Sequence, residues 1–87
     1  MTNGNDNQQQ VNFVFNLHET QQELILALST LETFFKTISK DKDIAYLIRH
    51  ELGDNSATIV SHTYQVMKYL EIVIEHNQML LNAMSNK

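Results

Sequence analysis

An apolar doublet recurs every seven residues along the C-terminal part of the chain, and this repeat limits the possible folds. The doublets are Ile59-Val60, Val66-Met67, Val73-Ile74 and Leu80-Leu81. A seven-residue apolar period predicts a helix with one apolar stripe, here over residues 56–85. The stripe occupies three or more of every seven positions, whereas a two-helix hairpin needs about two. Its width therefore predicts a core of three or four helices.

Two further helices precede this one. Apolar residues alternate at spacings of three and four from Val14 to Ile38, with Gln21 in one slot, which predicts a helix over about 12–38. The polar segment 39–43 predicts a break, followed by a short helix over about 42–52 that ends before Gly53. The chain has no Pro and only two Gly, so long unbroken helices are possible. Residues 1–10 are expected to form a disordered polar tail, and residues 11–87 a single helical domain.

The predicted fold class is all-α: a long antiparallel helical hairpin with a short helix at the bend, assembled as a dimeric helix bundle. An antiparallel register that places Leu28 opposite Leu70 also places Gln21 opposite Asn77. The two amides can satisfy each other's donors and acceptors, which is interpreted as a device that sets the register. The alternative is that both amides lie at a solvated end of the bundle. The seam expected on the third helix comprises Ile59, Thr63, Val66, Leu70, Val73, Asn77, Leu80 and Met84.

The pattern also predicts self-association. The short second helix can cover less than half of the hairpin, which leaves an apolar surface around residues 13–28 and 70–84. Monomeric proteins rarely expose such a patch. A second copy in a two-fold dimer is the expected cover, and a different protein is the alternative. The predicted interface residues are Leu17, Gln21, Leu24, Leu28, Leu70, Val73, Ile74, Asn77, Leu80, Leu81 and Met84.

The sequence offers little for catalysis or metal binding. Helical metal sites usually pair a His with another His or a carboxylate three or four residues away. The close pairs here, His18-Glu19, His50-Glu51 and Glu75-His76, are adjacent and point to different faces of a helix, and His62 shares its face with Val66. The chain has no Cys, no nucleophile-elbow motif and no phosphate-loop motif. We therefore expect a non-enzymatic protein without a metal or another cofactor.

One short segment gives an alternative function. Residues 48–60, "IRHELGDNSATIV", resemble the helix-turn-helix segment of the tryptophan repressor type. Gly53 matches the turn glycine, with Ile48 and Leu52 before it and Ile59 after it. Arg49, Asp54 and His62 depart from the pattern. The other interpretation is a charged turn that keeps one end of the bundle soluble.

The resemblance implies a DNA-binding regulator that uses residues 44–69. A formal net charge of −4 does not favour nucleic acid as a partner, so DNA binding is kept as the alternative only. The residues that the resemblance would offer to DNA are Arg49, Asn55, Ser56, Thr58, Ser61, Gln65 and Lys68.

Location and general role follow from composition. The chain begins without a signal-peptide pattern, and its longest unbroken apolar run is the five residues 24–28. We expect a soluble, cytoplasmic protein that does not bind membranes. The preferred function is a small protein-interaction protein, acting as an adaptor, chaperone or regulator.

Overall fold

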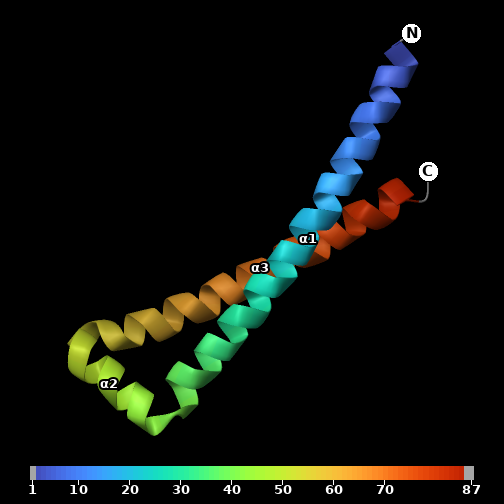
Figure 1. Cartoon of the computed structure of the whole chain (residues 1–87). Coiled ribbons are helices and arrows are strands. Elements are labelled where there is room, and N and C mark those ends of the chain that lie inside the picture. Colours follow the sequence, from blue (N-terminus) through green and yellow to red (C-terminus); the bar gives the residue numbers. More distant parts are fainter. Residues whose placement is uncertain (1, 86–87) are drawn as a thin grey trace.

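The protein is an all-helical hairpin. The computed structural model describes the backbone of residues 2–85 and the side chains of residues 8–85. The helix α1 (Thr2–Lys40) is followed by α2 (Lys42–Leu52), by the short 3-10 helix η1 (Gly53–Asn55) and by α3 (Ser56–Ser85), and residues 2–85 include no strand. The two long helices run antiparallel and cross, while α2 joins their ends at the bend (Figure 1). Among the described residues, no helix combines the length and apolar character that a membrane crossing requires.

Local signals build the bend. Asp41 has an extended backbone, and its side chain accepts hydrogen bonds from the backbone N–H groups of Asp43 (3.0 Å) and Ile44 (3.1 Å). It therefore caps the start of α2. At the other end Gly53 has φ 57° and ψ −124°, and its N–H donates to the carbonyl oxygen of Arg49. The bounds of α2 coincide with those expected from the sequence.

The first helix starts earlier than the sequence indicates. It begins at Thr2, so residues 2–10 continue α1 and do not form a separate tail. Extending an existing helix adds one hydrogen bond for each residue fixed, and the Gln residues of this stretch are good helix formers. Met1 and residues 86–87, which complete the expected tail and domain, lie outside the described residues.

The two long helices pack through a seam of residues that alternate at spacings of three and four. Every seam side chain is buried or half-buried. Val14 and Met84 line one depression, and Ile38 and Val60 line another near the bend, as expected for the register that pairs Leu28 with Leu70. The seam comprises Val14, Leu17, Gln21, Leu24, Leu28, Leu31, Phe35 and Ile38 of α1, and Val60, Thr63, Met67, Leu70, Ile74, Asn77, Leu81 and Met84 of α3.

The seam on α3 differs from the one expected from the sequence. In the later doublets the second residue is the more buried: Leu81 is 2% exposed, whereas its neighbour Leu80 is 42% exposed. Val66 and Val73 likewise lie at the edge of the seam, with exposures of 46% and 43%. Both residues of a doublet fit an apolar stripe, and only the packing against α1 decides which of them is central.

The predicted amide pair does not form. Gln21 is 5% exposed, and its Nε2 atom donates to the backbone carbonyl of Ile74 at 2.8 Å instead of to Asn77. The Oε1 atom of Gln21 is buried without a hydrogen-bond partner among the described residues. A helix carbonyl one turn away therefore replaces the expected side-chain partner.

The hairpin is thin and extended. It measures 64 × 19 × 15 Å, and its radius of gyration is 19.2 Å, against about 12 Å for a compact domain of this length. Its accessible surface is 6929 Å², whereas a compact protein of the same mass exposes about 5,300 Å². The buried apolar side chains among the described residues are Leu17, Ile38 and Leu81. One layer of side chains therefore holds the two long helices together.

Candidate interaction surface

One side of the hairpin carries an apolar strip along its whole length. In an antiparallel pair of helices, the residues that immediately precede every second seam residue, one in each heptad, lie on the same side of the pair. On α1 these positions precede Val14, Gln21, Leu28 and Phe35, and on α3 they precede Val60, Met67, Ile74 and Leu81. We call this strip the apolar face: Phe13, Thr20, Ala27 and Phe34 of α1, with Ile59, Val66, Val73 and Leu80 of α3.

The apolar face carries no charge and is open to solvent. None of its eight residues is ionisable. Phe13 is 49% exposed and Phe34 is 42% exposed, similar to the valines of α3. Only Ile59 is half-buried. Side chains of this size that stay exposed in a row are unusual on a monomer, because single exposed apolar residues are ordinary but long contiguous strips are not.

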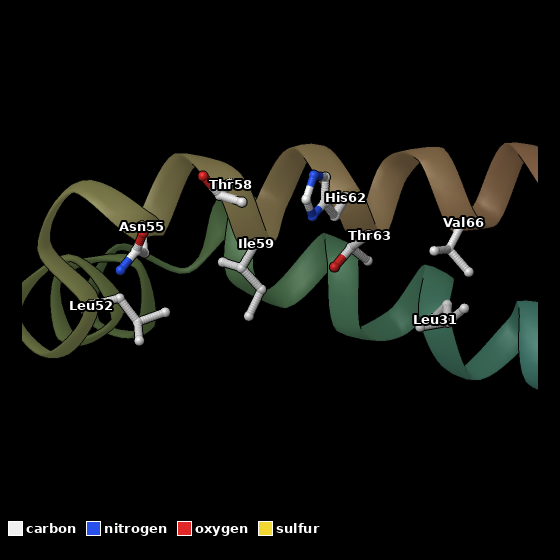
Figure 2. A pocket seen from close by; sticks show the side chains of 8 residues that line it. All are labelled: Leu31, Leu52, Asn55, Thr58, Ile59, His62, Thr63 and Val66. Carbon is white, nitrogen blue, oxygen red and sulfur yellow. The ribbon is translucent and has the colours of Figure 1, made fainter.

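A depression of about 460 Å³ lies in the apolar face beside the bend. Leu31 of α1 and Leu52 of α2 line one side of it, while Ile59 and Val66 of α3 line the other (Figure 2). Asn55, Thr58, His62 and Thr63 complete the lining. The depression is therefore mostly apolar at its base, with polar groups from the start of α3.

The opposite side of the hairpin has a different character. The rings of Phe35 and Tyr64 lie 5.8 Å apart, and the Lys68 ammonium lies 5.2 Å from the Tyr64 ring centre. Lys68 Nζ also donates to Glu71 Oε1 at 3.3 Å. This hydrogen bond raises the pKa of Lys68 above its ordinary value. Charged and aromatic groups therefore contact one another on this side, which also carries the exposed apolar side chains of Phe15 and Ile25.

The structure divides the predicted interface residues into two groups. Val73 and Leu80 lie on the apolar face, where a partner can reach them. The other nine (Leu17, Gln21, Leu24, Leu28, Leu70, Ile74, Asn77, Leu81 and Met84) lie in the seam, where they join α1 to α3 within one chain. The prediction omitted Phe13, Phe34 and Val66. Each of them immediately precedes the first of the two seam residues of its heptad, and this position is the sequence signal that identifies them.

The residues of the helix-turn-helix hypothesis do not share one surface. Asn55 and Thr58 line the depression of the apolar face, whereas Arg49 and Ser56 line a depression of about 250 Å³ beneath α2. The other three (Ser61, Gln65 and Lys68) are exposed along the outer side of α3. DNA binding stays a prediction.

Among the side chains of residues 8–85, no three His, Asp or Glu residues form a group able to hold a metal ion. Comparison of the chain with protein-family models, with curated proteins and with solved structures gave no match.

Proposed function

We propose that this chain is a small non-enzymatic interaction protein that self-associates through its apolar face. Two copies joined by this face form a homodimeric four-helix bundle. The observation that carries the proposal is the uncharged, exposed strip that runs the length of the hairpin. A two-fold dimer buries the same strip of both copies at once, which no rearrangement within one thin hairpin can do.

The surface area of the chain supports this proposal. The chain exposes 6929 Å², about 1,600 Å² more than a compact protein of its mass. A standard protein interface buries roughly 800 Å² on each partner. One copy therefore has enough excess surface for a stable dimer interface and for further contacts.

Apolar residues outside the apolar face suggest what the dimer does. Leu26 and Met79 are 68% and 62% exposed, and neither the face that joins the copies nor its edges include them. In a dimer these side chains remain on the outer surface. They suit helix-to-helix docking of another protein, which is the role of an adaptor, chaperone or regulator.

The self-association is tested by measuring the mass in solution. Light scattering on a sizing column, from about 100 down to 1 μM protein, should give the mass of two chains at the upper concentrations. A single-chain mass at every concentration would contradict the proposal.

A matched pair of variants locates the interface. Val73 lies on the apolar face and is 43% exposed, and its neighbour Ile72 lies off the face and is 48% exposed. Val73→Asp should raise the dimer dissociation constant by more than about 100-fold, because it buries a carboxylate without a partner in each copy. Ile72→Asp should leave the dimer unchanged. If both variants dimerise equally well, the apolar face is not the interface.

A further inference from the structure

Two copies can bring their apolar faces together in two ways. When the two-fold axis runs along the hairpin, both bends lie at the same end and α1 packs against α3 of the partner. When the axis runs across the hairpin, the bends lie at opposite ends and α1 packs against α1 of the partner. We propose that the dimer has the first arrangement, an inference that rests on the proposed self-association.

Charge on the edges of the apolar face distinguishes the two arrangements. We call the row of residues beside the apolar face, on the side away from the seam, its edge. On α1 this edge is exposed and includes one carboxylate, Glu23. The edge on α3 is also exposed and includes two histidines, His62 and His76. The complete edges are Asn16, Glu23, Thr30 and Thr37 on α1, and His62, Tyr69, His76 and Ala83 on α3.

The register of the hairpin sets these edge residues level with one another. Since Leu28 is level with Leu70, Glu23 is level with His76 and Thr30 is level with Tyr69, across the width of one copy. An axis along the hairpin keeps these levels and brings Glu23 against the partner's His76 twice in each dimer. Imidazole can donate a hydrogen bond to a carboxylate in either protonation state, and it forms an ion pair when protonated.

The other arrangement places like groups together. An axis across the hairpin sets the α1 edge against the same edge of the partner, and the two histidine-bearing edges against each other. Carboxylates then have only uncharged or like-charged groups to face across the interface. Like charges that meet across an interface disfavour that docking geometry.

The depression beside the bend fits the same arrangement. Phe34 lies on the apolar face of α1, level with Thr63 and Val66 of α3. With both bends at one end, Phe34 of each copy lies over the partner's Val66 and enters the partner's depression. That depression has a volume of about 460 Å³ and an apolar base, so it can accept an aromatic ring. This contact would bury the side chain of Phe34, which is 42% exposed in a single copy.

Cysteine cross-linking tests the arrangement, because the chain has no Cys of its own. Thr30→Cys and Tyr69→Cys in one chain place thiols on the two edges at the same level. A short bis-maleimide should link this double variant into covalent dimers on a denaturing gel. The single variant Thr30→Cys should stay monomeric on the gel, since its two copies lie diagonally across the bundle.

The opposite side of the hairpin provides the matched control. Ser29→Cys with Lys68→Cys places thiols at nearly the same level on that side, and it should give no covalent dimer. If Thr30→Cys alone cross-links as well as the double variant, the arrangement is wrong while the self-association stands. If light scattering shows only single chains, the proposed function itself fails.

Exchange of the charges gives a second readout. His76→Glu should weaken the dimer about three- to tenfold, because two exposed carboxylate pairs then face each other in every dimer. Adding Glu23→Lys should restore the original dissociation constant. In the opposite arrangement lysines would face lysines and glutamates would face glutamates, so failure of the second change to restore binding would overturn the inference.

Discussion

At the scale of single residues, Gln21 is the least expected part of the seam. It is 5% exposed and bonds through Nε2 to the Ile74 carbonyl, while its Oε1 atom has no partner among the described residues. That carbonyl already accepts the regular hydrogen bond of its own helix. A half-satisfied amide in an apolar layer costs stability.

Replacing this amide should stabilise the protein. Gln21→Leu is expected to raise the free energy of unfolding by about 1 kcal/mol, because it removes a buried oxygen without a partner and leaves the α3 backbone bonded. Urea denaturation at a fixed protein concentration measures the change. The control Gln22→Leu, at an exposed position, should shift stability by less than about 0.5 kcal/mol. A loss of stability in Gln21→Leu would show that the bond to Ile74 outweighs the unpaired atom.

At the scale of the elements, the bend was the most predictable part. The signals at Asp41 and Gly53 act over three or four residues, so they could be read directly from the sequence. The start of α1 could not be read in this way, because residues 2–7 include several Asn and Asp residues that each suit an N-cap, and α1 continues through them.

The choice of residue within each doublet was equally hidden. The heptad pattern gives the width of the apolar stripe, but Ile74 and Val73 fit it equally well. Only the angle at which α1 meets α3 puts Ile74 in the seam and Val73 on the apolar face. The candidate surface was therefore foreseen as a strip, and most of its individual residues were assigned by the structure.

The junction between α2 and α3 depends on one backbone conformation. Gly53 has φ 57° and ψ −124°, and a Cβ built there meets no atom within 4 Å. Gly53→Ala should lower the free energy of unfolding by about 1–3 kcal/mol through backbone strain alone. Circular dichroism during heating measures this loss, with the exposed neighbour Asp54→Ala as the control. Equal melting temperatures for the two variants would mean that the bend tolerates another backbone path.

At the scale of the whole molecule, the proposed dimer would couple folding to assembly. A hairpin 15–19 Å across has one layer of buried side chains, which gives a single copy only a small core. Joining the apolar faces adds a second layer and covers the exposed rings of Phe13 and Phe34. We therefore expect most of the stability of the protein to come from the dimer.

This coupling makes the melting temperature depend on concentration. Raising the protein from about 1 to 100 μM should favour the folded dimer by about 2.7 kcal/mol and increase the melting temperature. Val73→Asp, confined to single chains, should melt at a lower temperature that does not change with concentration. A wild-type melting temperature independent of concentration would show that one copy folds without its partner.

The length of the hairpin has a hydrodynamic consequence. A rod 64 Å long experiences more friction than a sphere of equal mass, so a single copy migrates as a larger protein would. Pairing side by side doubles the mass and the cross-section but leaves the longest dimension close to 64 Å. The proposed dimer would therefore have a lower frictional ratio than its own subunit, and it would sediment faster than a dimer that kept the elongated shape of the subunit. Association end to end would give the reverse, a longer particle with still greater drag.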